Sequence, residues 1–280
     1  MTPSHFQDAS VADPNAPATW DVWDDRETGS LAARIGTDVA LLREVQEGAR
    51  LPTARIWQPA RGIAVTRAEA RLPGFDGACA SSAASGWPVV VRESGGGAVP
   101  HDVGVLCLSL LFEPPPRLSL EEAYAWLCEP LVIALESFQV PVSTGAVPGA
   151  FCDGRFNLTA SGRKIIGTAQ RWRARPGRGG HGAVLAHASW LVDLDLPDAT
   201  AALNRFQAAA GSDTRFAPDA CTTLRAELAR RGDARAHVPT EILVGIAREA
   251  LFEALGRGAP PLLASERMDG TSESSDPCGA

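Results

Sequence analysis

The chain has 280 residues, 45% of them hydrophobic and 21% charged, a composition typical of a globular protein with a substantial core. Its formal net charge of −7 argues against a general nucleic-acid binder. No apolar run reaches the roughly 20 residues that a membrane-spanning helix needs, and residues 1–18 lack a signal-peptide pattern, so we expect a cytoplasmic protein without a membrane partner.

The six cysteines form no CxxC pair. Their scattered spacing argues against a zinc site and against a disulfide framework. We therefore expect free thiols and no bound metal. The cysteines are Cys79, Cys107, Cys128, Cys152, Cys221 and Cys278.

The first third of the chain predicts one helix and several short strands. Residues 1–18 are polar and proline-rich, which indicates a flexible lead-in. Residues 30–47 repeat apolar side chains every three or four positions, as an amphipathic helix does. The small-residue segment 74–86 is assigned no element. Strands are expected at residues 53–58, 62–66 and 87–92, the last of them buried.

A glycine-rich segment, ESGGGAVPHD, follows the third of these strands. Glycines are costly inside a strand, but their bare N–H groups let carboxylate, carbonyl or phosphate oxygens approach closely. The Walker and GxGxxG patterns are absent, so a ligand cradle and a structural turn are equally open interpretations. The His-Asp step is an orienting pair, a general base or, most commonly, a structural turn. The candidate binding residues are Arg92, Ser94, Gly95, Gly96, Gly97, His101 and Asp102.

The remaining chain reads as a long strand, a core helix, a hairpin and three surface helices. Ser119 is the expected N-cap of the core helix. Strict alternation along the second hairpin arm places Lys164, Thr168 and Gln170 on one face, which we expect to turn toward a ligand. The expected ranges are a strand at 103–112, a helix at 118–138, hairpin arms at 156–160 and 164–172, a strand pair at 182–194, and helices at 199–209, 217–230 and 240–255. One domain is predicted over 19–260, followed by a disordered tail at 261–280.

Lys164 is the only lysine among 26 basic residues, all the others being arginine. A compact ammonium and a planar guanidinium are not interchangeable donors, so this exception suggests a specific role, although chance on a solvated strand is the alternative. Cys152 lies twelve residues upstream among turn-forming residues. A thiol and an amine close together suit acyl chemistry, while a small buried hydrophobe is the plain alternative for the cysteine. Lys164 or Arg155 could supply the positive charge that favours a thiolate.

Two blocks of sequence resemble the lipoate-protein ligase and octanoyltransferase family, which shares its catalytic domain with biotin protein ligases. They are RESGGGAVPHDVGVL and FCDGRFNLTASGRKIIGTAQRWR, the second with a Gly-x-Lys-x-x-Gly-x-x-Gln core. The resemblance implies an α+β fold with a mixed, largely antiparallel central sheet flanked by helices, and an acyl tunnel roofed by the glycine loop. It also implies that Lys164 holds the acyl carbonyl or the activated intermediate, and that Gly167, Thr168, Ala169 and Gln170 belong to the binding site.

The family has two branches that activate the acyl group differently. Ligases use ATP and magnesium to make an acyl-adenylate, whereas the cysteine transferases form a thioester and need no cofactor. The FCDG segment resembles the FCPG-type motif of the transferases, with Asp153 in place of proline, so Cys152 is the expected nucleophile. The triple glycine and the His101-Asp102 step look closer to the ligases, and a non-catalytic lipoate-binding module is a third possibility.

The resemblance also implies the partners. These are an octanoyl or lipoyl donor and lipoyl-domain proteins, namely the glycine cleavage H protein and the E2 subunits of 2-oxoacid dehydrogenases. His181 or His101 is the candidate base for the acceptor amine.

Overall fold

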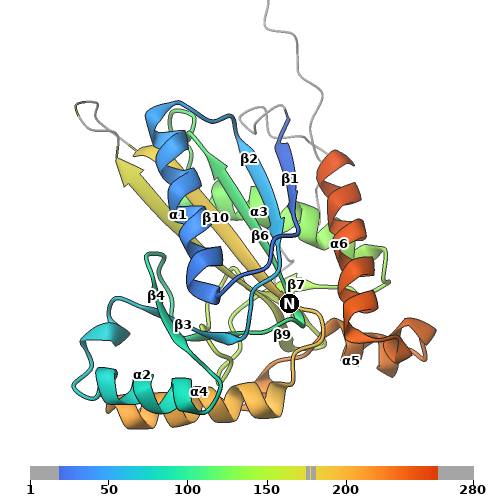
Figure 1. Ribbon diagram of the computed structural model, residues 1–280. Helices are drawn as coiled ribbons and strands as arrows, with labels where there is room; N and C mark the ends of the chain where they lie inside the picture. Colours follow the sequence, from blue (N-terminus) through green and yellow to red (C-terminus); the bar gives the residue numbers. More distant parts are fainter. Residues whose placement is uncertain (1–18, 175–176, 178–180, 258–280) are drawn as a thin grey trace, which may run out of the picture.

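Seven strands form the main sheet of the computed structural model, which describes residues 19–174, 177 and 181–257 (Figure 1). All neighbouring strands in this sheet are antiparallel except the first pair, β1 and β2. In spatial order the strands are β1 (Asp21–Asp25), β2 (Thr53–Trp57), β6 (Val105–Phe112), β10 (His181–Leu191), β9 (Arg163–Ala174), β8 (Leu158–Ala160) and β7 (Ser143–Thr144).

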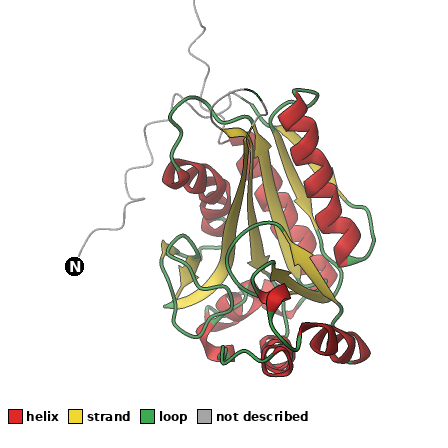
Figure 2. Ribbon diagram, turned by 90° about the vertical axis from the view of Figure 1, so that its left-hand side faces the viewer, coloured by secondary structure: helices red, strands yellow, loops and turns green. Residues whose placement is uncertain are grey.

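Helices cover both faces of this sheet, as the turned view shows (Figure 2). One face packs against α3 (Leu120–Glu136), α5 (Leu224–Arg230) and α6 (Thr240–Arg257) through the largest apolar cluster. The other face is covered in part by α1 (Leu31–Glu47), which packs against β6 and β10. The α+β fold with a mixed, largely antiparallel sheet flanked by helices is therefore confirmed.

A second sheet of three strands lies beside α1 on the same side of the main sheet (Figure 1). Its strands, in spatial order, are β4 (Val89–Arg92), β3 (Gly62–Thr66) and β5 (Val99–His101). The helices α2 (Phe75–Ala84) and α4 (Leu196–Ala210) pack on one another and share an apolar cluster with the two sheets. Short 3-10 turns are formed by Glu69–Arg71, Pro218–Ala220 and Ala234–His237.

The predicted helix starts are confirmed by their caps. Ser30 accepts a hydrogen bond from the Ala33 N–H ahead of α1, and Ser119 forms a full capping box with Glu122 ahead of α3. Such caps satisfy N–H groups that a helix leaves without partners, which is why serine marks both starts.

Several predictions need correction. The segment 74–86 contains α2, whose small residues allow it to pack closely on α4. Strand β1 was missed, the strand pair expected at 182–194 is the single strand β10, and Val91 in the strand expected to be buried is 43% exposed. The predicted lead-in at 1–18 and tail at 261–280 lie outside the described residues.

No helix in the described ranges is long and apolar enough to cross a bilayer.

Candidate active site

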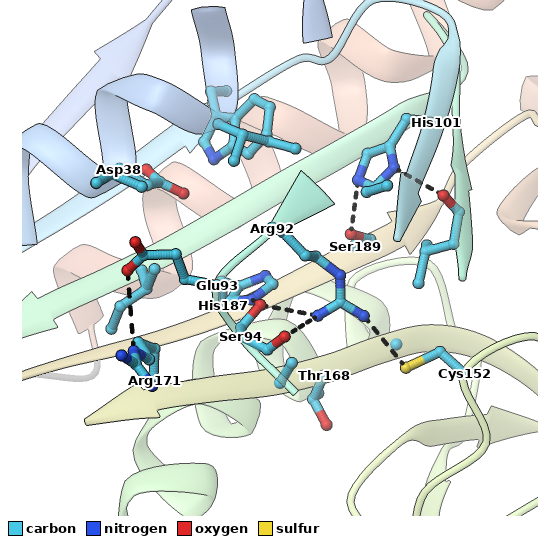
Figure 3. A pocket seen from close by; sticks show the side chains of 18 of the residues that line it. Asp38, Arg92, Glu93, Ser94, His101, Cys152, Thr168, Arg171, His187 and Ser189 are labelled. Carbon is cyan, nitrogen blue, oxygen red and sulfur yellow. Dashed lines mark hydrogen bonds and ion pairs between the residues drawn. The ribbon is translucent and has the colours of Figure 1, made fainter. Parts of the chain in front are cut away.

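A pocket opens between the main sheet, α1 and the small sheet (Figure 3). Its empty volume is about 720 Å³, counting the space open to solvent at the mouth. Its floor is formed by residues of β9 and β10 between the paired positions Gly167–Ser189 and Arg171–Leu185. Four residues of extended strand span about 13 Å, so the pocket is long enough for an extended chain.

Cys152 lies at the Gly167 end of this pocket on a loop with unusual backbone geometry. Its φ of 49° is in the left-handed region, which non-glycine residues rarely adopt. The Gly97 N–H donates to the sulfur at 3.2 Å, and Arg92 Nη2 lies 3.7 Å from it. Both contacts direct positive charge at Sγ.

Gly96 leaves the space that the sulfur occupies. Its φ is 100°, and a Cβ built on it would lie 2.3 Å from Cys152 Sγ and 3.3 Å from Arg92 Nη2. No side chain fits there, so glycine at this position is required both by the backbone angle and by the close approach of the thiol.

Arg92 is a buried guanidinium whose Nη1 and Nη2 groups donate to the glycine loop, whereas its Nε has no hydrogen-bond partner among the described residues. Nη1 donates to the carbonyl and hydroxyl oxygens of Ser94 at 3.2 and 2.8 Å and to the Gly95 carbonyl at 2.5 Å, while Nη2 donates to the Gly97 carbonyl at 2.7 Å. Among the described residues no carboxylate lies within 4.0 Å of Arg92 to pair with its charge. A buried cation without a carboxylate favours a negative charge in the pocket beside it, either a thiolate or an anionic ligand.

Lys164 is only 1% exposed and holds the cysteine loop rather than the sulfur. Its ammonium donates to the carbonyl oxygens of Phe151 at 2.5 Å and Cys152 at 3.0 Å. Asn157 also donates to the Cys152 carbonyl, at 3.1 Å. Burial lowers the pKa of Lys164 from its ordinary value. The solvated-strand alternative for this lysine is therefore wrong.

The cation in contact with the sulfur is Arg92, which the sequence did not suggest, and Lys164 also interacts electrostatically with Cys152. Lys164 contacts the loop carbonyls, and Arg155 forms an exposed ion pair with Glu121 at 2.5 Å. Sequence distance gave no indication of this, because Arg92 precedes Cys152 by 60 residues.

A β-bulge in β9 reverses the face expected to carry the ligand. Leu158 pairs with Ile166 but Thr159 pairs with Lys164, so Ile165 is an extra residue on β9. Alternation consequently shifts by one position, and Lys164 shares the pocket side with Gly167 and Ala169. Gln170 lies on the opposite side, where it donates to the Leu120 carbonyl at 3.1 Å. The Thr168 hydroxyl lies at the pocket edge and donates to the Phe156 carbonyl at 3.0 Å.

Two histidines of the pocket are held neutral by their surroundings. Burial lowers the pKa of His101 to about 4 and that of His187 to about 3. His101 Nδ1 lies 3.3 Å from the Val99 carbonyl and its Nε2 lies 3.4 Å from Ser189 Oγ. His187 Nε2 lies 2.7 Å from Ser94 Oγ.

The predicted histidine roles change accordingly. Asp102 does not orient His101 but pairs with Arg61 at 2.7 Å. His181 is the first residue of β10 and its side chain lies outside the described residues, six positions or about 20 Å of strand from His187. His187 was missed by the sequence analysis, although a histidine in the apolar run AVLAHASWLV is a usable signal.

The far end of the pocket is formed by α1 and β2. Ile35, Val39, Leu42 and Trp57 give it apolar walls suited to a hydrocarbon chain. Asp38 also lines this end, where Arg55 Nη1 and the Ser109 hydroxyl each donate to its carboxylate at 2.6 Å.

The chain is similar to known proteins in sequence and in fold. The family model for the lipoyl protein ligase A/B catalytic domain matches residues 32–239. An uncharacterized protein of Cupriavidus necator is 35% identical over 246 residues, which cover 82% of this chain and 96% of that protein. An octanoyl-[GcvH]:protein N-octanoyltransferase of Kyrpidia tusciae is 37% identical over 191 residues, covering 67% of this chain and 66% of that enzyme. The fold is similar to the crystal structure of lipoate-protein ligase A bound with ATP, with a TM-score of 0.63 at 18% identity over 86% of this chain and 85% of that one.

Proposed function

Because this chain belongs to the lipoyl protein ligase A/B catalytic domain family, we propose that it transfers an octanoyl or lipoyl group to a lysine of a lipoyl-domain protein through a thioester on Cys152. The observation that carries this proposal is the position of the sulfur. It lies at one end of an apolar-walled pocket, with the Gly97 N–H and the Arg92 guanidinium both directed at it.

In the first half of the reaction, the Cys152 sulfur attacks the acyl carbonyl of the donor protein's acyl-lysine. The new S–C bond forms, the amide C–N bond breaks, and the donor lysine leaves as an amine after taking up a proton. In the second half, the acceptor lysine amine attacks the thioester carbonyl. The S–C bond then breaks, the amine loses a proton, and the thiol is regenerated.

Lys164 has two parts in this proposal. Two of its three N–H groups bind the Phe151 and Cys152 carbonyls and thereby hold the left-handed turn that presents the sulfur. The third is directed at the acyl oxygen, where negative charge develops during each attack.

The carboxylates of the pocket support the branch that uses no nucleotide. Magnesium prefers carboxylate oxygens and water as ligands. Glu93 is paired with Arg173 at 2.6 Å and Arg67 at 3.1 Å, and Asp38 is bound by Arg55 and Ser109, so each carboxylate already has strong donors. ATP-dependent ligation remains the alternative, because the fold is also that of a ligase bound with ATP.

The proposed partners follow from the relative's name and from the chemistry. The Kyrpidia tusciae enzyme is named for octanoyl-[GcvH] as donor, so we propose the glycine cleavage H protein as the acyl donor here. The lipoyl domains of 2-oxoacid dehydrogenase E2 subunits are the proposed acceptors.

One paired experiment tests the proposal. The purified protein is mixed with octanoylated or lipoylated H protein and an apo lipoyl domain without nucleotide, and in parallel with lipoic acid, ATP and magnesium. Intact mass of the acceptor is read in each. Acyl transfer in the first mixture is the expected result, whereas modification only in the second would make the protein a ligase.

A further inference from the structure

A chain of hydrogen bonds leads from the main sheet to the cysteine sulfur. It runs from His187 to Ser94 Oγ at 2.7 Å, from Ser94 Oγ to Arg92 Nη1 at 2.8 Å, and from Arg92 Nη2 to Cys152 Sγ at 3.7 Å (Figure 3). A guanidinium can only donate, so the Ser94 oxygen accepts from Arg92, while the same hydroxyl donates to or accepts from His187 Nε2 according to the histidine tautomer. In either tautomer His187 is neutral, because burial disfavours its charged form.

This chain of hydrogen bonds connects the flexible glycine loop to the rigid strand β10. The loop that carries Ser94 contains three successive glycines, whose backbone has the most freedom to lose on folding. His187 instead lies in the middle of β10, paired with Ala169 on one side and Ser109 on the other. The contact between Ser94 and His187 thus fastens the start of the glycine loop to the central sheet.

Because the guanidinium is planar, the contact at Ser94 also fixes the direction of the donor that faces the sulfur. Nη1 and Nη2 belong to one rigid fork, so a hydroxyl that fixes the direction of Nη1 also fixes that of Nη2. The other contacts of Arg92 are to backbone carbonyls of the loop itself, which move with the loop. Ser94 Oγ is therefore the side-chain contact that links the guanidinium, through His187, to the main sheet.

We propose that Ser94 and His187 are positioning residues that keep the Arg92 guanidinium directed at the Cys152 sulfur. This inference rests on the proposed function, in which the sulfur is the nucleophile. Neither residue touches the reacting sulfur; each acts through Arg92. The pair His101 and Ser189 forms a separate chain in the same pocket, which ends at Val99 and Cys107 and does not reach Arg92.

The test measures the reactivity of Cys152 directly. Full-length wild-type, Ser94→Ala, His187→Leu and His187→Gln proteins are treated with iodoacetamide at pH 7, and alkylation of Cys152 is followed by peptide mass spectrometry. Cys79, a half-buried thiol on α2, serves as the reference in each sample. Ser94→Ala and His187→Leu are expected to slow alkylation of Cys152 relative to Cys79 about tenfold, the effect of losing one hydrogen bond to a charged network. His187→Gln, whose side-chain amide can both donate and accept a hydrogen bond, is expected to recover most of the rate.

Transfer kinetics and a matched control complete the design. Ser94→Ala is expected to lower kcat by a factor similar to that for alkylation while leaving KM for the donor within about twofold, because the donor-binding walls are intact. The double variant Ser94→Ala/His187→Leu is expected to be no slower than the slower single variant, because both act through one chain. Ser82→Ala removes another buried serine hydroxyl, bonded to the Trp87 carbonyl at 2.6 Å far from Cys152, and is expected to leave both rates unchanged.

Two outcomes would overturn the inference: unchanged Cys152 alkylation in Ser94→Ala, or additive losses in the double variant. Either would still leave the proposed function intact if wild-type enzyme transfers acyl groups without nucleotide. Conversely, undiminished transfer by Cys152→Ala would remove the proposed function, whatever the alkylation rates are.

Discussion

At the residue scale, the Cys152 sulfur and the Lys164 ammonium have separate roles in the site. Cys152 Sγ receives the Gly97 N–H and the Arg92 guanidinium, whereas Lys164 binds the carbonyls of the loop that carries the cysteine. The other described cysteines lack this surrounding. Burial raises the pKa of Cys107 and Cys128 to about 12 and that of Cys221 to about 11, so these thiols are expected to be inert.

A covalent adduct on Cys152 alone is the first prediction. Incubation with an acylated donor protein followed by acid quenching should leave one acyl group on the Cys152 peptide, removable by hydroxylamine. Cys152→Ser should block transfer, because a serine hydroxyl ionises far less readily than a thiol at neutral pH. Cys221→Ser is the matched control, since this buried thiol lies under the same loop but should carry no adduct.

The second prediction concerns Lys164. Lys164→Arg keeps the charge but overfills a space in which Nζ already lies 2.5 Å from the Phe151 carbonyl, so we expect stability to fall by about 1–3 kcal/mol and transfer to be lost. Lys164→Met keeps the approximate volume without the donors, and it should also abolish transfer. Urea unfolding and transfer rate are measured for both variants. Near-normal transfer by either variant would show that Lys164 is not needed for catalysis.

At the scale of elements, a loop and a bulge decide what enters the pocket. The glycine loop approaches Cys152 so closely that no side chain fits at Gly96. The bulge at Ile165 then brings Lys164 to the same side of β9 as Gly167, where a Cβ would lie 2.9 Å from Lys164 Nζ. The pocket end that contains the sulfur is thus shaped by two local departures from regular structure.

Substitution in the loop gives the third prediction. Gly96→Val should abolish transfer and displace the Cys152 side chain, because its Cβ alone would lie 2.3 Å from Sγ at a backbone φ of 100°. Gly95→Ala is the neighbouring comparison, since its Cβ would meet nothing within 4 Å, and its effect on transfer should be far smaller. Transfer rate and thermal unfolding are compared for the two. Equal effects would mean that the loop acts through general flexibility rather than through the space at Gly96.

At the scale of the whole molecule, the pocket lies where the two sheets meet, and its histidines are buried there. Their ordinary pKa of about 6.5 falls to about 4 for His101 and about 3 for His187. The unfolded chain therefore takes up protons below pH 6.5 that the folded protein does not. The contribution of the two neutral histidines to the free energy of unfolding is fully present above pH 6.5 and is lost as the pH falls toward 4.

The fourth prediction is the resulting acid sensitivity. Between pH 6.5 and 4.5 the free energy of unfolding should fall with decreasing pH by up to about 1.4 kcal/mol per pH unit for each of the two histidines. Urea unfolding across this range measures the slope. His101→Gln and His187→Gln should each reduce it. A slope that no histidine variant changes would assign the acid sensitivity to carboxylates.

Much of this protein could be predicted from its sequence because the relevant signals are local. Apolar spacing and capping serines predicted α1 and α3, and alternation around Ser161-Gly162 predicted the β8–β9 hairpin. The lone lysine and the glycine loop directed attention to Lys164 and Cys152, and the two motifs identified the family before any coordinates. These features depend on residues close together in the chain, where periodicity and turn chemistry apply directly.

Only the tertiary structure decided the electrostatics of the site. It placed Arg92 in contact with the sulfur, brought His187 to the pocket, and turned Gln170 away through the bulge. Each of these depends on contacts between residues far apart in sequence, or on a one-residue shift in strand pairing that reverses every side chain beyond it. Neither kind of information is carried by local periodicity, which is why the sequence indicates the residues that we propose to react but not the contacts that position them.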